Sequence, residues 1–208
     1  MNSTDNTGWK VKLKIVRDTV YLYQKYGIKA LSMGDVARLT GISQKALNGY
    51  FPTKTALLRA CIGYQIYQED LFRYTEGRLL DVLLNYAETF PRLHQKMNRR
   101  CCMDIKKYYP SIYVFLTEIM TRFAFVCQKK VEEGISTGYI RKNIYPNLVY
   151  VFLRENFSRL FTIEVVDQEY GNRMMTEMIL AFIRGISTEK GRAYMDKELK
   201  IRIQYEAD

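Results

Sequence analysis

The sequence predicts an all-α protein with a small head of three short helices and a larger bundle of longer helices. Apolar side chains recur at the three- and four-residue intervals of an α-helix along nearly the whole chain. Nothing in the sequence reads as two strands joined by a hairpin turn. The 208 residues are 48% hydrophobic, which is enough for a packed core and excludes wholesale disorder.

Positive charge is concentrated at the start of the chain. Residues 1–60 hold ten Lys or Arg side chains against three Asp and no Glu, a net charge of +7. The remaining 148 residues hold 22 basic and 19 acidic side chains, a net charge of +3. A basic head on a nearly balanced body predicts a polyanionic partner at the N-terminus. Charge alone does not distinguish nucleic acid from an anionic membrane surface.

Residues 9–41 predict two helices. Residues 9–26 carry an apolar stripe with lysines on the other faces, and Gly27 is suited to end that helix in the left-handed conformation. Ser32 is a good N-cap for a helix over 33–40, and Asp35 stands where a capping box has its acidic residue. Gly41 ends this second helix.

A third short helix is expected over residues 44–49, with Ser43 as its N-cap, before a break at Pro52 and Thr53. Longer helices then follow, at 54–74, 77–98, 101–107, 111–134, 145–163 and 171–187. Pro110 and Pro146 suit first helical turns, whereas Pro91 is expected to kink or break its helix. The charged tail from residue 188 is expected to form a loose helix or to fray.

The segment from Leu31 to Leu47 has the spacing of a helix-turn-helix. Small and apolar residues allow two helices to cross closely, and Gly41 gives the turn a permissive backbone. Such a motif presents the N-terminal residues of its second helix to the DNA major groove. These residues are Gln44 and Lys45, whose side chains can bind adenine and guanine edges. The alternative is an ordinary helical hairpin.

Residues 12–58 resemble the DNA-binding head of the tetracycline-repressor family of bacterial transcription regulators. The likeness lies in the sequences Asp-Val-Ala at 35–37, Gly-Ile-Ser at 41–43 and Tyr-Phe-Pro-Thr-Lys-Thr-Ala-Leu-Leu at 50–58. It continues more weakly through 133–146, which is similar to a turn between late helices in many members. The resemblance implies an all-helical homodimer with a DNA-binding domain at 1–53 and a ligand-binding and dimerisation domain at 54–208, in which 54–74 is a linking helix.

The resemblance also implies which residues bind double-stranded operator DNA. Ser32, Tyr50 and Lys54 match positions that contact phosphates, and Gln44 and Lys45 match positions that read bases. Backbone amides at the helix starts, including the one after Ser43, favour phosphate oxygens. Asn48 stands where many members have Tyr, Gly49 where they have a larger polar residue, and Gly34 where they often have Arg. These departures bear on sequence preference and affinity, not on the fold.

The body is expected to bind a small, largely apolar effector and to form the dimer. Most of its aromatic residues are expected to be core residues, because they recur at helical spacing, but some should line a pocket between helices. The candidates are Tyr86, Phe90, Tyr109, Tyr113, Phe123 and Phe157. Apolar stripes on the last two long helices, 145–163 and 171–187, predict the dimer seam. A stable dimer would hold two recognition helices at the spacing of about 34 Å, one turn of DNA.

Other chemistries fit the sequence less well. Gly-Ile-Ser-Thr-Gly at 134–138 matches a hydrolase nucleophile elbow, but that motif needs a preceding strand and a later histidine, and His94 is the only histidine. No catalytic residues, cofactor or metal site are therefore predicted. Cys101 and Cys102 lie among basic residues and could form a thiol sensor, but reduced packing cysteines are the favoured interpretation.

The predicted function is a ligand-responsive transcription regulator that represses until its effector binds. The polar N-terminus lacks the pattern of a signal peptide, and the longest apolar runs are about six residues, as at 148–153. A cytoplasmic protein without a membrane-spanning segment is expected. The alternative is an enzyme or lipid-binding helical protein that keeps a degenerate head.

Overall fold

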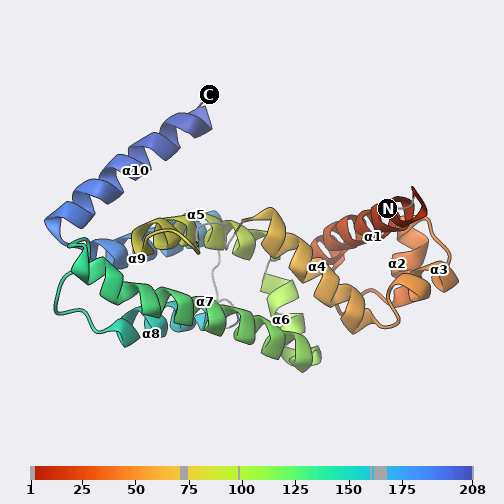
Figure 1. The fold of residues 1–208 in the computed structure, drawn as a ribbon. Helices are drawn as coiled ribbons and strands as arrows, with labels where there is room; N and C mark the ends of the chain where they lie inside the picture. Colours follow the sequence, from red (N-terminus) through yellow and green to blue (C-terminus); the bar gives the residue numbers. More distant parts are fainter. Residues whose placement is uncertain (1–2, 71–74, 98, 160, 162–167, 208) are drawn as a thin grey trace. The chain divides into compact units, whose positions relative to one another are not determined.

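In the computed structural model, residues 3–70, 75–97, 99–159, 161 and 168–207 are described, and these residues form ten helices and no strand (Figure 1). A single antiparallel bridge joins Ile140 to Ser187. The all-α prediction is confirmed. Contacts divide the chain into a head unit, residues 1–69 and 96–116, and a body unit, residues 70–95 and 117–208. The predicted functional division after residue 53 stays a prediction.

The head unit is built around its first helix. This helix, α1 (Ser3–Tyr26), packs against α2 (Met33–Thr40), α4 (Lys54–Gln68) and α6 (Arg99–Tyr108), while α2 packs against α3 (Gln44–Tyr50). Each helix contributes apolar side chains to one buried core, namely Ile15, Val16, Val36, Leu47, Leu57, Leu58, Ile62 and Ile105. Burial of such side chains stabilises the unit by roughly 1.5–3 kcal/mol each.

The three helix starts of the head are formed as the sequence predicts. The side chains of Ser32, Ser43 and Thr53 each accept a hydrogen bond from the backbone amide three residues later. Gly27 and Gly41 take positive φ angles of 87° and 73°, which end α1 and α2 in the left-handed conformation that favours glycine. These caps satisfy backbone groups that a short helix leaves without partners.

The linking helix is shorter than predicted. The sequence predicts a helix over 54–74, but α4 ends at Gln68. Asp70 has a φ angle of +51°, a left-handed conformation that Asp tolerates better than most residues and that cannot continue a helix. Residues 71–74 of the predicted helix lie outside the described residues.

The body unit contains α8 (Pro146–Arg159), α9 (Gln168–Ile186) and α10 (Glu189–Ala207), together with most of α5 (Leu79–Met97) and α7 (Pro110–Ser136). Its buried apolar residues come from each of these helices; they include Leu83, Leu84, Phe90, Ala124, Val131, Val149, Leu153, Ile179, Ile183 and Met195. Residues 160, 162 and 163 of the helix predicted over 145–163 fall outside the described residues.

Pro91 does not break α5. A proline removes the amide that would bind the carbonyl four residues earlier, here that of Ala87. The Thr176 hydroxyl of α9 lies 3.4 Å from the Ala87 carbonyl oxygen and donates a hydrogen bond to it. Helix α5 therefore continues through the buried Pro91, and the expected break is wrong because a neighbouring helix supplies a donor.

The charged tail forms a full helix instead of fraying. The Thr188 hydroxyl accepts a hydrogen bond from the Gly191 amide at 3.1 Å and so caps α10. The Tyr194 hydroxyl donates a 2.6 Å hydrogen bond to Asp81, and Met195 is fully buried. Long-range packing thus holds the first half of α10, which the local sequence alone did not reveal.

One helix in the described part of the chain, α7, is long and apolar enough to cross a membrane by length and composition. A core helix of a soluble protein has the same properties. In α7 the side chains of Phe123, Ala124, Cys127 and Val131 are buried within the protein. The sequence estimate based on short apolar runs did not identify this helix.

Two glycines of the body are predicted to respond oppositely to alanine. A Cβ atom at Gly191 would overlap the Tyr139 carbonyl oxygen, whereas a Cβ atom at Gly185 would meet open space inside a helix. Gly191→Ala should lower the free energy of unfolding, and Gly185→Ala should raise it by up to about 1 kcal/mol. Denaturant unfolding of both variants checks this, and a Gly191→Ala protein as stable as the parent would contradict the close approach.

Candidate nucleic-acid interface

The second helix of the helix-turn-helix, α3, has a single side chain buried in the core of the head. Leu47 is fully buried, whereas Gln44, Lys45 and Asn48 are exposed. The Ser43 hydroxyl oxygen caps the start of α3, and the Phe51 amide donates to the Leu47 carbonyl at its end. Helix α3 therefore presents almost its whole surface to solvent, as a DNA-reading helix requires.

The predicted base-reading residues lie together at the start of α3. Gln44 and Lys45 are consecutive and exposed. A Cβ atom placed at Gly34 would be 3.5 Å from Gln44 Oε1, so the Gln44 side chain lies against α2 at this glycine. The absence of a side chain at position 34, where the family often has Arg, leaves room for this orientation of Gln44.

Ser32 and Ser43 differ in how their hydroxyl groups are used. Ser32 Oγ accepts from the Asp35 amide at 3.1 Å, and the Ser32 amide donates to Asp35 Oδ2 at 3.0 Å, which completes a capping box. The Ser32 hydroxyl also donates to Asp35 Oδ2, at 2.6 Å. These hydrogen bonds, followed by the one from Arg38, hold the pKa of Asp35 below its usual value. Ser43 Oγ accepts from the Ala46 amide at 3.1 Å, which leaves its hydroxyl hydrogen for another acceptor.

Lys54 is engaged with the protein. Its Nζ donates a 2.6 Å hydrogen bond to the Ile28 carbonyl oxygen and lies 5.5 Å from the centroid of the Tyr109 ring. The ammonium group therefore joins the start of α4 to the turn after α1 and to the segment between α6 and α7. Tyr50, the other predicted phosphate contact in this region, is half-buried at the end of α3.

Lys12 is a basic residue near the interface that the sequence did not single out. Its Nζ lies 5.4 Å from the centroid of the Phe51 ring, which places an exposed ammonium group beside the junction of α3 and α4. The helical spacing of lysines along α1 was the available signal, but it does not tell which lysine faces that junction.

The six predicted ligand-binding residues are divided between the two units, four in the body unit and two in the head unit. Tyr86 stacks on Phe90 and on Phe123, with centroid distances of 4.5 and 5.5 Å, and all three rings are buried in the body unit. Phe157, also buried in the body, packs edge-on against Phe161 at 5.4 Å. Tyr109 and Tyr113 belong to the head unit. The structure thus brings three of the six residues into one stack.

The largest groove that we describe in the body is polar and includes none of these six residues. It has a volume of about 320 Å³ and lies between α5 and α9. Its lining residues, polar apart from one proline, are Glu88, Pro91, Arg92, Gln95, Asn172, Arg173, Thr176 and Glu177. The aromatic stack is closely packed and is not part of this groove.

The four cysteines are free and buried. Burial, the largest effect at both positions, raises the pKa of Cys101 and of Cys102 to about 12, so both remain thiols near neutral pH. Cys101 also donates a hydrogen bond to the Tyr23 carbonyl at 3.2 Å. A low-pKa, accessible thiolate, which a thiol sensor requires, is therefore not formed in this structure. Among the described residues no cluster of His, Cys, Asp and Glu could hold a metal ion.

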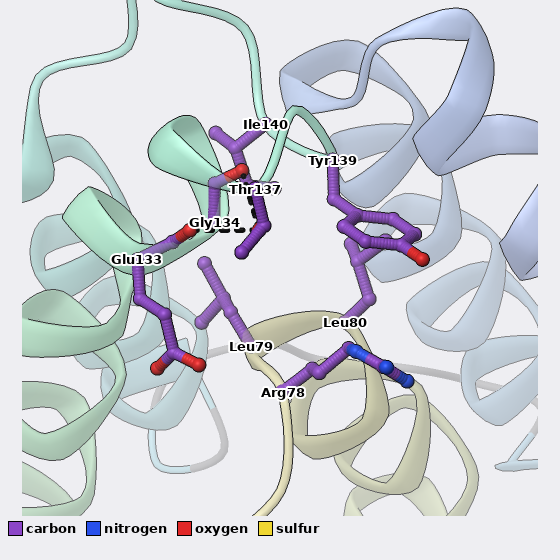
Figure 2. A pocket seen from close by; sticks show the side chains of 8 residues that line it. All are labelled: Arg78, Leu79, Leu80, Glu133, Gly134, Thr137, Tyr139 and Ile140. Carbon is purple, nitrogen blue, oxygen red and sulfur yellow. Dashed lines mark hydrogen bonds between the residues drawn. The ribbon is translucent and has the colours of Figure 1, made fainter.

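The segment that matches a nucleophile elbow, residues 134–138, is the end of helix α7 and the turn that follows it (Figure 2). Helix, not strand, precedes it, and the Ser136 hydroxyl donates to the Glu133 carbonyl at 2.9 Å. The adjoining pocket between Leu79, Gly134 and Tyr139 holds only about 20 Å³, the size of one water molecule. This geometry does not support the hydrolase interpretation.

Comparison with known proteins agrees with this geometry. Residues 15–61 match the family described as "Bacterial regulatory proteins, tetR family". No curated protein matches the chain. These 47 matched residues contain α2 and α3 whole, together with parts of α1 and α4.

Solved structures extend the likeness beyond the head. A gamma-butyrolactone receptor (ArpA-like protein) is 17% identical, with a TM-score of 0.66 over 96% of this chain and 99% of that chain. A TetR-family regulator from Cytophaga hutchinsonii is 12% identical, with a TM-score of 0.64 over 88% and 98%. CprB from S. coelicolor A3(2) is 15% identical, with a TM-score of 0.60 over 89% and 93%.

At these identities the solved structures show a shared fold, and the family match is confined to residues 15–61. This chain combines a basic head, a capped helix-turn-helix with an exposed second helix, and a helical body. The head of the chain, residues 15–61, matches the tetR family of bacterial regulatory proteins, and the chain shares the fold of solved TetR-family regulators.

Proposed function

We propose that the chain is a TetR-family transcription regulator, that it represses transcription by binding operator DNA as a homodimer in the cytoplasm, and that a small, largely apolar effector releases it. The exposure of α3 carries the proposal. Only Leu47 of this helix is buried, and the side chains of Gln44, Lys45 and Asn48 are free to enter a major groove. Repression and release need only an effector with different affinities for the DNA-bound and released conformations, so no enzymatic step is required.

The proposed DNA contacts divide into base reading and positioning. Gln44 and Lys45 read base edges, with Asn48 one turn further along the same helix. Ser32, Ser43, Tyr50 and Lys54 position the head on phosphates. The Lys54 ammonium group donates a hydrogen bond to the Ile28 carbonyl and so stabilises the head. In the proposed complex its positive charge also attracts a nearby phosphate.

The proposed dimer seam is supported by exposed apolar side chains on α8 and α9. Leu148 and Val151 are each 45% exposed, and Met174 and Met178 are 37% and 40% exposed. Exposed apolar residues on two consecutive helices are typical of a surface that another protein covers. A second copy of this chain is the proposed cover, which would give a two-fold arrangement of heads.

The proposed effector site is the aromatic stack of the body. The Tyr86 hydroxyl is buried and has no hydrogen-bond partner in the protein, so it is a polar group within an apolar cluster. An apolar effector that separates Tyr86, Phe90 and Phe123 and offers one acceptor would pair with this hydroxyl. The similarity in fold to a gamma-butyrolactone receptor supports a small-molecule effector.

Binding to DNA upstream of its own gene tests the function. In a gel-shift experiment the protein should bind this fragment far more tightly than unrelated DNA. The affinity should fall by about 10³-fold or more between 50 and 200 mM salt, because counterions are released from several phosphates. Weak binding to every sequence would favour the degenerate-head alternative, and a salt-insensitive affinity would contradict the phosphate contacts.

Substitution of two lysines should separate recognition from stability. Lys45→Met should weaken operator binding by about 1–3 kcal/mol and leave unfolding unchanged, because its side chain is exposed. Lys54→Met should weaken DNA binding and also lower the free energy of unfolding by about 1–2 kcal/mol, because the Ile28 carbonyl loses its donor. Fluorescence anisotropy and denaturant unfolding measure the two effects. Equal stability of both variants would argue against the Lys54 contact.

A charge in the proposed seam should dissociate the dimer. Val151→Lys or Met178→Lys would bury an unpaired ammonium between two copies, so sedimentation at micromolar concentration should change from dimer to monomer. Tyr67→Lys is the control, because Tyr67 is 76% exposed on α4, outside the proposed seam. A parent protein that sediments as a monomer would defeat the dimer proposal.

A further inference from the structure

A small cavity lies inside the head unit, between α1, α4 and α6. Its volume is about 20 Å³. A cavity needs roughly 10–15 Å³ on this measure to hold one water molecule, so this one is large enough for a single water and too small for an effector. Apolar and cysteine side chains make up most of its wall, and Tyr23, Gln24, Gln65 and Lys96 supply the polar groups.

The Tyr23 hydroxyl is a buried polar group of this cavity that has no partner in the protein. Tyr23 is 3% exposed, and its Oη accepts and donates no hydrogen bond. Burial is the main cause that raises the pKa of Tyr23 above its usual value, so the hydroxyl keeps its proton and remains a donor. Buried hydroxyl groups in native proteins are nearly always hydrogen-bonded, and internal water is a common partner where protein atoms are out of reach.

The remaining polar groups limit which atoms a water molecule could bind. The Cys61 and Cys101 thiols donate to the Val16 and Tyr23 carbonyls, so they are already used. At the rim, Gln24 donates to the Lys96 carbonyl, and the Lys96 ammonium pairs with Glu69. Gln65 of α4 is 7% exposed and lines the cavity, and a side-chain amide can both donate and accept a hydrogen bond.

We infer that this cavity binds one ordered water molecule, which accepts a hydrogen bond from Tyr23 Oη and forms a second one with the Gln65 side-chain amide. The water joins α1 to α4 across the core of the head unit. It is a structural ligand of the helix that supports the recognition motif, and it is independent of operator and effector. Wholly apolar cavities stay dry, but this one is lined by polar residues from two helices, Tyr23 of α1 and Gln65 of α4.

High-resolution crystallography of the whole protein tests the site directly. We expect one spherical density peak in the cavity, within hydrogen-bond distance of Tyr23 Oη and of the Gln65 amide. An empty cavity would overturn the inference, as would a Tyr23 hydroxyl that binds a protein group instead.

Thermal unfolding provides the second test. Tyr23→Phe should lower the unfolding midpoint by about 2–4 °C, because the water loses a partner, and Gln65→Met should act similarly. The double variant should lose less than the sum of the two, since both remove the same water. Tyr21→Phe is the matched control, because Tyr21 is 62% exposed on the same helix. An unchanged or raised midpoint for Tyr23→Phe would mean that the hydroxyl is unpaired in the native state, and the inference would fail.

Discussion

The burial of Leu47 is the constraint on which the DNA-reading surface depends. A helix of seven residues is too short to be stable alone in water. Leu47 fixes α3 to the head core, and the caps at Ser43 and Phe51 satisfy its ends. Because the burial of Leu47 is enough to hold α3 in place, nearly all other side chains of this helix can contact DNA. The same arrangement explains why Gly49, a weak helix former, is tolerated near its end.

A second set of contacts joins the turn between α1 and α2 to α4 and α6, and α6 comes much later in the chain. The Lys29 amide donates to Asp104 at 2.7 Å, and Lys29 Nζ donates to the Tyr108 hydroxyl at 3.0 Å. Lys54 holds the neighbouring Ile28 carbonyl. The turn between α1 and α2 is therefore hydrogen-bonded to both α4 and α6. The head unit thus extends well beyond the helix-turn-helix. A shift in the position of α6 would therefore alter the conformation of the turn that orients α2.

The features that the sequence predicted are those that depend on neighbouring residues. The N-caps at Ser32, Ser43 and Thr53 and the left-handed glycines are local, so the helices of the head were placed within a few residues. The passage of α5 through Pro91 and the packing of α10 depend on Thr176 and Asp81, which are far away in sequence. The expectation that most aromatic residues of the body are core residues is wrong. Five are buried, namely Tyr86, Phe90, Phe123, Phe157 and Phe161, whereas the other described ones are half-buried or exposed, as are Tyr108 and Phe125. Their division between the two units could not be seen, because α7 crosses from one unit to the other.

The central claim is that the start of α3 enters the major groove, and guanine methylation interference tests it most directly. A methyl group on N7 projects into the major groove and would collide with a helix lying there. We predict that methylation of a few guanines, in two half-sites about one helical turn apart, abolishes binding of the protein to its operator. Binding that is indifferent to N7 methylation at every guanine, but sensitive to minor-groove adenine methylation, would contradict the account.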